Sequence, residues 1–136
     1  MDDNFCFGCS PDNPIGLHLE CFAQEDGTWA AYFIPTRYHE SYNGIMHGGL
    51  VATILDELIA NHLDKGRGLR AVTGRLEVRF RHPVPIGAKI KCVSRIIREK
   101  GRLFQMEAHT ELPDGRIAVE ARADMMARGK RETRDT

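Results

Sequence analysis

The sequence predicts an α+β fold in which an antiparallel sheet wraps around one long central helix. Only the segment from His47 to about Leu63 has both the length and the apolar content of a long helix. Segments of alternating apolar and polar residues lie before and after it, and short turns join them. No further helix separates these segments, so a parallel sheet built from βαβ units is excluded.

Two strands are predicted before the helix. Residues 17–22 alternate in the order Leu-His-Leu-Glu-Cys-Phe, residues 24–27 form a hairpin turn, and residues 28–34 form the returning strand. A turn-rich lead-in of residues 1–16 precedes them. Residues 35–45 form a long loop before the helix, and long loops in compact domains are often functional.

The helix is predicted to be buried on nearly every side within one domain. Apolar residues occupy almost every direction around it, namely Leu50, Val51, Ala52, Ile54, Leu55, Leu58, Ile59, Ala60 and Leu63. Residues 64–68 contain two glycines and are predicted to end it.

Four longer strands are predicted after the helix, at residues 69–81, 88–98, 103–111 and 116–126. The first of them carries Val72, Leu76, Val78 and Phe80 at even-numbered positions, which place them on one face of a regular strand. Residues 17–127 are thus expected to form one domain, followed by a charged tail at residues 128–136.

The composition limits the kinds of partner. The chain has 136 residues, and its 19 Lys and Arg residues balance its 19 Asp and Glu residues. A formal charge of zero gives no electrostatic reason to expect nucleic acid. No apolar run approaches the roughly 20 residues that a membrane span needs. The acidic, polar residues 1–4 do not resemble a secretory signal, so a cytoplasmic location is expected.

The cysteines predict no metal site. There are four of them, and only Cys6 and Cys9 form a Cys-x-x-Cys pair. A zinc site normally needs a second pair of ligands, and the residues that follow Cys9 are typical of turns rather than of a redox helix. Reduced, structural thiols are therefore expected. His18 could complete a metal site only if the N-terminal segment folds back.

The stretch from Asn43 to Glu57 is the candidate site. A helix that opens on His-Gly-Gly, at residues 47–49, offers unpaired N–H groups and therefore favours negative charge. Asp56 and Glu57 interrupt an apolar run, where a carboxylate is costly unless it is paired or takes part in chemistry. The segment thus supplies a polarising group and a nucleophile or base, as acyl transfer requires.

The spacing of these groups predicts a homodimer. His47 and Asp56 are nine residues apart, which separates them by about 13 Å along a helix and places them on opposite faces. One helix cannot bring both its start and its own Asp56 to one carbonyl. We expect two central helices side by side in opposite directions, so that each site takes Gly48 from one chain and Asp56 from the other.

Three motifs carry a resemblance to a known family. One is Asn-Gly-x-x-His-Gly-Gly at residues 43–49, followed by Asp56. Another is Phe-Arg-His-Pro-Val-Pro-Ile-Gly at residues 80–87, and the third is the lead-in with Cys-Phe-Gly-Cys at residues 6–9 and Gly-Leu-His-Leu at residues 16–19. The chain resembles hot-dog-fold acyl-CoA thioesterases of the phenylacetate-pathway (PaaI-like) type, within the 4-hydroxybenzoyl-CoA thioesterase superfamily.

The resemblance implies hydrolysis of an acyl-CoA or aryl-CoA thioester, with no cofactor besides the CoA of the substrate. The N–H of Gly48 would polarise the carbonyl, and the partner's Asp56 would attack it or activate a water. Asn43 would orient the water or donate to the oxyanion, and His47 would support or cap rather than act as the base. Glu57 is the alternative catalyst, because some members use Glu on this helix.

The resemblance also implies substrate contacts. Thr73 falls where members place a hydroxyl near the site. Tyr42 and Met46 are expected to line an aryl or medium-chain acyl pocket, beside Gly49. The phosphates of CoA need a basic rim, for which the candidates are Arg81, His82, Lys100, Gly101, Arg102 and Arg128. A dimer of dimers is expected, and the acyl group is left open.

Several alternatives stay open. Asp56 could be a structural carboxylate paired with Arg or Thr, the glycines of the helix start could permit close packing, and Asn43 could form a turn. Asn61 and His62 are expected at an interface or on the surface. A non-catalytic acyl-CoA binding or sensing protein of the same fold is the alternative function. The Asp/His motif of hot-dog dehydratases is not found.

Overall fold

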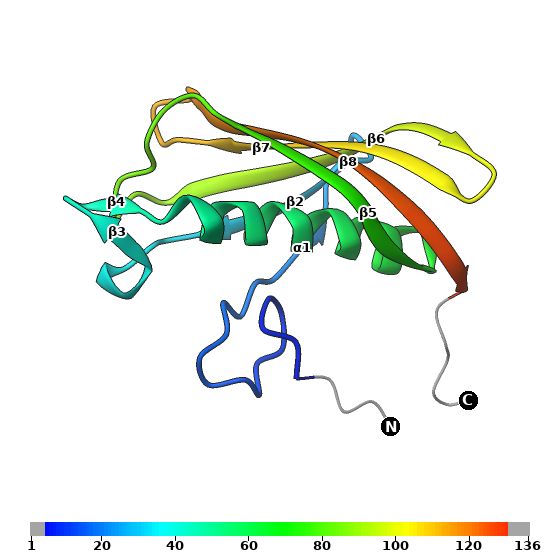
Figure 1. The fold of residues 1–136 in the computed structure, drawn as a ribbon, viewed down its shortest axis with the longest axis horizontal. Helices are drawn as coiled ribbons and strands as arrows, with labels where there is room; N and C mark the ends of the chain where they lie inside the picture. The colour runs from blue at the N-terminus through cyan, green and yellow to red at the C-terminus, as the bar shows by residue number, and fades with distance from the viewer. Residues whose placement is uncertain (1–4, 131–136) are drawn as a thin grey trace.

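One antiparallel sheet curves over a single long helix (Figure 1). The computed structural model describes residues 5–130. Its six-stranded sheet has the order β1-β2-β6-β7-β8-β5 and packs on α1 (Gly48–Arg67). The strands are β1 (Phe22–Ala23), β2 (Trp29–Phe33), β5 (Leu69–Phe80), β6 (Ile90–Lys100), β7 (Leu103–Glu111) and β8 (Ile117–Lys130). The predicted α+β fold is confirmed.

The ends of the chain differ in part from their predicted extents. The last strand continues to Lys130, four residues beyond its predicted end. Residues 1–4, which carry the expectation about a secretory signal, and residues 131–136 of the predicted tail lie outside the described residues. Within residues 5–130, no helix is long and apolar enough to cross a membrane.

Helix α1 is one turn longer than predicted. It ends where Gly68 adopts a left-handed conformation (φ 66°) and donates its N–H to the Asp64 carbonyl. Lys65 and Arg67 in the last turn favour this extension, because their charge opposes the negative end of the helix dipole. Gly66 lies inside the helix, and the Trp29 indole packs closely against it. A Cβ on Gly66 would lie 2.9 Å from the Trp29 indole nitrogen.

The prediction that α1 is buried on nearly every side is confirmed only in part, because the single chain leaves one stripe of the helix partly exposed. The side toward the sheet holds the buried residues Val51, Ile54, Leu55, Leu58, Ile59 and Leu63. A stripe with the spacing i, i+4, i+7 and i+11 stays partly or fully exposed and consists of Gly49, Thr53, Asp56 and Ala60. The helix sequence is thus more apolar than one chain requires.

Strand β5 is an edge strand and contains a bulge. Its register against β8 shifts between Thr73 and Arg75, so Gly74 is an extra residue. The bulge reverses which positions face the helix. Ala71 packs against the core before it and Leu76 after it, whereas Val72 is 45% exposed. The expectation that Val72 and Leu76 share a face is therefore wrong.

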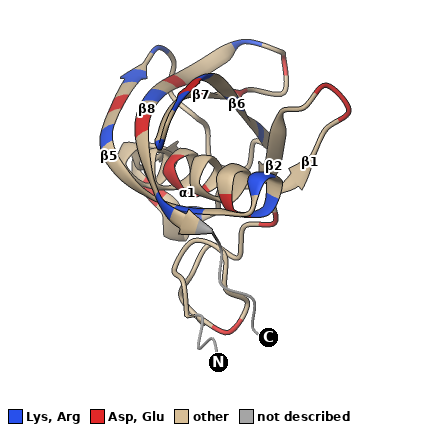
Figure 2. Cartoon of the chain, turned by 90° about the vertical axis from the view of Figure 1, so that its right-hand side faces the viewer, with Lys and Arg blue, Asp and Glu red and all other residues tan. Residues whose placement is uncertain are grey.

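The N-terminal segment folds back against α1, on the side away from the sheet (Figures 1 and 2). The N–H groups of Leu17 and Leu19 donate to the carbonyls of Phe7 and Gly8, at 2.7 and 2.8 Å. Both leucines are buried in the core. These contacts replace most of the strand predicted at residues 17–22, of which only the last residue belongs to β1.

The loop before α1 contains a short hairpin. A 3-10 turn at Arg37–His39 leads into β3 (Glu40–Tyr42) and β4 (Ile45–Met46). Asn43 and Gly44 connect the two strands with positive φ angles of 53° and 74°, as a two-residue hairpin turn requires. The hairpin lies immediately before the start of the helix (Figure 1).

Candidate active site

The start of α1 has one unused hydrogen-bond donor. His47 caps the helix, because its Nδ1 accepts the N–H of Gly49 at 2.9 Å. The His47 carbonyl accepts the N–H groups of Leu50 and Val51. Among residues 5–130, no acceptor is found for the N–H of Gly48. Gly48 is therefore the position at which a ligand can receive a hydrogen bond from the helix start.

A hollow of about 350 Å³ lies at this helix start. It brings together five of the predicted site residues, Tyr42, Met46, Gly48, Arg81 and His82. Phe80 also lines it, and a Cβ on Gly48 would lie 3.2 Å from the Phe80 ring. A side chain at this position would therefore require the exposed Phe80 ring to shift slightly. Sequence reasoning did not select Phe80, because its apolar alternation fits an ordinary strand.

Asp56 lies on the exposed stripe of the helix and has a specific partner. The Thr73 hydroxyl donates to Asp56 Oδ1 at 2.7 Å. Neither residue lines the hollow at the helix start. Gly48 and Asp56 are eight residues apart on one continuous helix, which corresponds to about 12 Å along its axis. Within one chain, the unused N–H of Gly48 and the Asp56 carboxylate are therefore too far apart to contact the same group.

Glu57 lies beside the N-terminal segment instead. Asn61 Nδ2 donates to Glu57 Oε2 at 2.7 Å, and the Cys6 thiol donates to Oε1 at 3.5 Å. Burial and a hydrogen bond to Glu57 raise the pKa of the Cys9 thiol to about 12. Cys9 is therefore protonated at neutral pH and is a poor nucleophile. The N-terminal segment does fold back, as a metal site with His18 would require. The His18 ring, however, contacts the Asn13 carbonyl at 2.6 Å and is not part of a cluster with the two cysteines.

A second hollow of about 540 Å³ lies at the other end of α1. It contains three of the residues predicted to bind CoA, Gly101, Arg102 and Arg128, together with Arg67, which was not predicted. Lys100 does not line it. The helix has 20 residues and is therefore about 30 Å long. One chain thus holds the predicted basic residues in two groups, one at each end of the helix.

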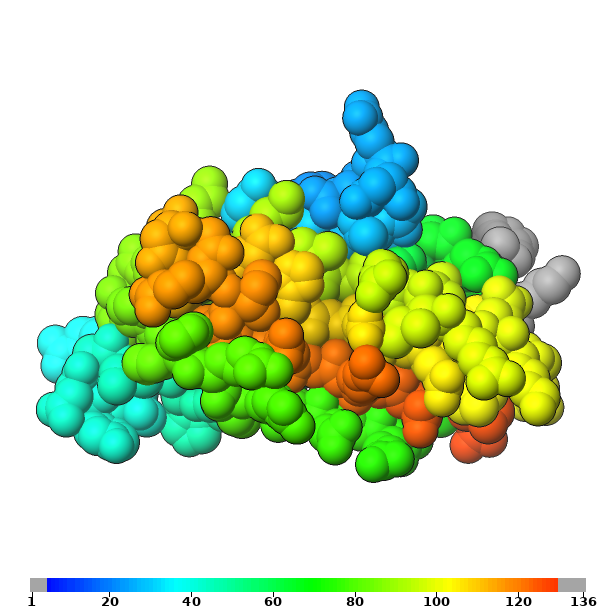
Figure 3. Space-filling view, turned by 90° about the horizontal axis from the view of Figure 1, so that it is seen from above, coloured from blue at the N-terminus to red at the C-terminus, as the bar shows by residue number. Residues whose placement is uncertain are grey.

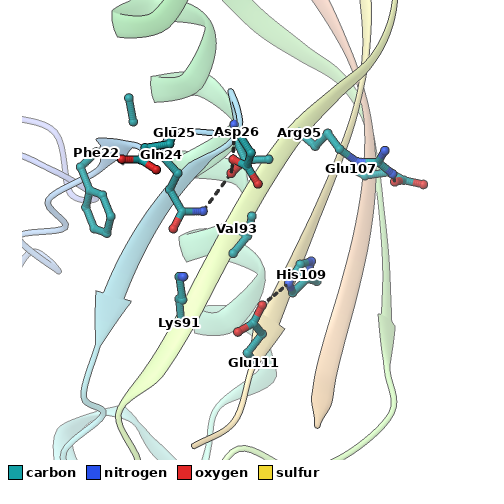
Figure 4. Close-up of a pocket in the computed structure, with 12 residues that line it drawn as sticks. Phe22, Gln24, Glu25, Asp26, Lys91, Val93, Arg95, Glu107, His109 and Glu111 are labelled. Carbon is teal, nitrogen blue, oxygen red and sulfur yellow. Dashed lines mark hydrogen bonds and ion pairs between the residues drawn. The ribbon is translucent and has the colours of Figure 1, made fainter. Parts of the chain in front are cut away.

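A third hollow, of about 840 Å³, lies on the outer face of the sheet, beside the projecting turn at residues 24–27 (Figures 3 and 4). It contains none of the predicted site residues. Two pairs of its side chains bond to one another, Arg95 with Glu107 and His109 with Glu111. We do not assign the active site to this hollow.

Three further polar residues, Asn43, Asn61 and His62, do not line the hollow at the helix start. Asn43 forms the hairpin turn and does not line the hollow there. Asn61 and His62 are buried rather than at the surface, so that expectation is wrong. The Nδ1 of His62 is 3.0 Å from the Ser94 hydroxyl, and burial lowers the pKa of this histidine.

Comparison with known proteins places the chain in a family. A sequence profile of the thioesterase superfamily matches residues 43–119. The chain belongs to the thioesterase superfamily. The matched part of this thioesterase-superfamily chain includes Gly48, Asp56 and Thr73, and it excludes the N-terminal segment and Arg128. No curated protein sequence is detectably similar to the chain.

Solved structures share the fold at low sequence identity. A thioesterase superfamily protein has a TM-score of 0.83 and 20% identity over 90% of this chain, which spans 60% of that protein. A hypothetical thioesterase with coenzyme A from Streptococcus pneumoniae has values of 0.76 and 19%, with 84% and 88% of the two chains covered. The Escherichia coli PaaI protein has values of 0.77 and 15%, with 85% and 83% covered. The hot-dog fold is thereby confirmed.

Proposed function

We propose that this chain is an acyl-CoA thioesterase of the PaaI-like type, which hydrolyses an acyl-CoA or aryl-CoA to the free acid and CoA. The observation that carries the proposal is the unused N–H of Gly48 at the wall of the hollow that Tyr42 and Met46 line. The fold relative from Streptococcus pneumoniae was solved with coenzyme A. The Escherichia coli relative comes from a phenylacetic acid degradation operon.

The helix start would bind the thioester carbonyl. The Gly48 N–H and the positive end of the helix dipole would stabilise the negative charge that develops on the carbonyl oxygen. The acyl group would contact Tyr42, Met46 and Phe80 in the hollow, close to Gly49. Asn43, which forms the hairpin turn, would contribute only if this turn approaches the substrate.

Asp56 would supply the second half of the chemistry. As a base, its carboxylate would take a proton from the water that attacks the carbonyl, and CoA would leave as the thiol after protonation of its sulfur. As a nucleophile, it would attack the carbonyl carbon and displace CoA from the thioester, and water would then hydrolyse the resulting mixed anhydride. The Thr73 hydroxyl holds one carboxylate oxygen and leaves the other available. Solved variants of the Streptococcus pneumoniae protein lose an aspartate in one case and a threonine in another.

A homodimer would unite the two halves. The exposed stripe of α1 and the unpaired edge of β5 are the surfaces that a second copy would cover. With two helices antiparallel, Gly48 of one chain would lie beside Asp56 of the other. Arg67 lies eleven residues beyond Asp56, or about 16 Å along the helix axis. The hollow at that end would then serve the same site as Asp56.

This arrangement divides the CoA contacts between the two chains. Arg102 and Arg128, with Gly101, would bind phosphates from the chain that provides Asp56. Arg81 and His82 would contribute from the chain that provides Gly48. Lys100 would act from the adjacent turn without lining the hollow. Further association into a dimer of dimers stays a prediction, which sedimentation equilibrium can measure.

The proposal is tested by thiol release from a panel of acyl-CoA esters, followed by mixing of two inactive variants. Asp56→Asn and Gly48→Pro would each inactivate the homodimer. If the halves come from different chains, mixed dimers with one intact site would restore about a quarter of wild-type activity after subunit exchange. No recovery in proven mixed dimers would contradict the shared site. Binding of acyl-CoA without thiol release would favour the non-catalytic alternative.

A further inference from the structure

Two cysteines and a glutamate form a cluster outside the proposed active site. The Sγ atoms of Cys6 and Cys9 and a carboxylate oxygen of Glu57 all lie within 4.8 Å of one another. The sequence alone shows only the cysteine pair. The third member comes from α1 and joins them because the N-terminal segment folds back against the helix (Figure 1).

The distance between one sulfur and one oxygen of this cluster equals that expected around a tetrahedral zinc ion. The Cys6 Sγ and Glu57 Oε1 atoms are 3.5 Å apart. With Zn–S of about 2.3 Å and Zn–O of about 2.0 Å, a tetrahedral angle separates sulfur and oxygen by about 3.5 Å. Thiolate ligands also favour Zn²⁺ over Mg²⁺ and Ca²⁺, which prefer sites made only of oxygen atoms.

The residues around the cluster hold its members in place. Asn61 is buried and donates to the second carboxylate oxygen of Glu57 at 2.7 Å, as a group that orients a metal ligand does. The Ser10 N–H donates to the Cys6 carbonyl and closes the turn that carries both cysteines. Gly8 allows the turn to approach the helix, because a Cβ there would lie 2.5 Å from Glu57 Oε1.

The carboxylate of the cluster has no cationic partner among the described side chains. Glu57 is partly buried, and within residues 5–130 no lysine, arginine or histidine forms an ion pair with it. A buried carboxylate without a counter-charge is costly. A divalent cation would bond directly to this carboxylate, and the two thiol protons would leave to solvent, so that the net charge of the cluster would not change on binding.

We propose that Cys6, Cys9 and Glu57 bind one Zn²⁺ ion per chain, with water as the fourth ligand. The ion links the N-terminal segment to α1 at Glu57, which directly follows Asp56 in the chain. It also occupies the Glu57 carboxylate, which therefore does not serve as the catalytic base. The site does not depend on the thioesterase proposal, because its ligands line neither hollow at the ends of the helix.

The experiment is metal titration of the full chain after removal of metal by a chelator under reducing conditions. Addition of Co²⁺ is expected to give thiolate-to-cobalt charge-transfer absorption that saturates at one equivalent and disappears when Zn²⁺ is added. Cys6→Ser, Cys9→Ser and Glu57→Gln should each weaken binding at least tenfold. Cys21→Ser is the matched control, because Cys21 is also partly buried but lies outside the cluster, and it should bind as the wild type does.

A further variant separates loss of the ligands from loss of the fold. Gly8→Ala keeps all three ligands and crowds the Glu57 carboxylate, so it should weaken Zn²⁺ binding while circular dichroism stays unchanged. Hydrogen exchange in residues 5–19 of the wild type should slow when Zn²⁺ is added. Absence of stoichiometric binding, equal binding by Cys6→Ser, or a Cys6–Cys9 disulfide in the protein as purified would overturn the proposal.

Discussion

Asp56 and Glu57 are neighbours in the sequence, yet the two sides of α1 give them different surroundings. Asp56 lies on the exposed stripe and accepts a hydrogen bond from Thr73 on the edge strand. Glu57 is covered by the N-terminal segment and contacts a cysteine and a buried amide. A step of about 100° around a helix is enough to separate a carboxylate that a substrate can reach from one that holds the fold together.

The largest expected effect tests this difference directly. Asp56→Asn should lower kcat for acyl-CoA hydrolysis by about 10³-fold, within the range that a general base contributes. Glu57→Gln should lower it by less than about tenfold, because the N-terminal segment covers this side chain. Steady-state thiol release measures both. The opposite order would make Glu57 the catalyst and remove the distinction between the two sides.

The next effect concerns the helix start. Gly48→Pro and Gly48→Ala both add a Cβ near Phe80, but only proline removes the N–H. Proline suits this first helical position, and the extended conformation of His47 (ψ 127°) tolerates a following proline. We expect Gly48→Pro to lower kcat about 10²-fold, because removal of one oxyanion donor has an effect of this size. Gly48→Ala should lower kcat much less. Equal losses would mean that crowding, and not the N–H, matters.

A smaller effect is expected at Thr73. Thr73→Val keeps the shape of the side chain and removes the hydroxyl that donates to Asp56. The hydroxyl positions the carboxylate, and a loss of about 1.4 kcal/mol of transition-state stabilisation would lower kcat about tenfold. Steady-state thiol release measures this, and an unchanged kcat would indicate that Thr73 only supports the strand.

The smallest effect is on stability and concerns the side of α1 that faces the sheet. Burial lowers the pKa of His62 from its ordinary value of 6.5, so the unfolded chain binds a proton more readily than the folded one. The free energy of unfolding should be fully present above pH 6.5 and should fall as the pH drops below it, by at most about 1.4 kcal/mol per pH unit from this one group. Urea unfolding at several pH values measures the slope. His62→Gln should reduce it, and an unchanged slope would assign the acid sensitivity elsewhere.

Much of the fold follows from local patterns in the sequence. The central helix and the four long strands have enough periodicity to be identified without the structure, and β7 begins and ends at the predicted residues, Leu103 and Glu111. The local pattern fails to predict the structure where contacts between residues distant in the sequence determine it. Leu17 and Leu19 alternate as a strand does, but their N–H groups bond to the turn at Phe7 and Gly8. A regular pattern cannot reveal a bulge either, so the alternation predicts the wrong face for Val72.

The candidate site was predictable to a similar extent. Residues that flank the helix start in sequence, such as Tyr42 and Met46, meet Gly48 in one hollow as expected. Local spacing also separates Gly48 from Asp56 within one chain. The surroundings of Glu57 could not be predicted, because the segment that covers it comes from the beginning of the chain. Arg67 was missed because a charged residue near a helix end has an ordinary explanation in the helix dipole.

The bulge at Gly74 acts within β5 as a frameshift does within a gene. Before it, odd-numbered positions such as Thr73 face the helix, and after it even-numbered positions such as Leu76 and Val78 do. Deletion of this one glycine would bring both halves into a single phase. The strand could then keep its apolar residues in the core or its hydroxyl on Asp56, but it could no longer do both.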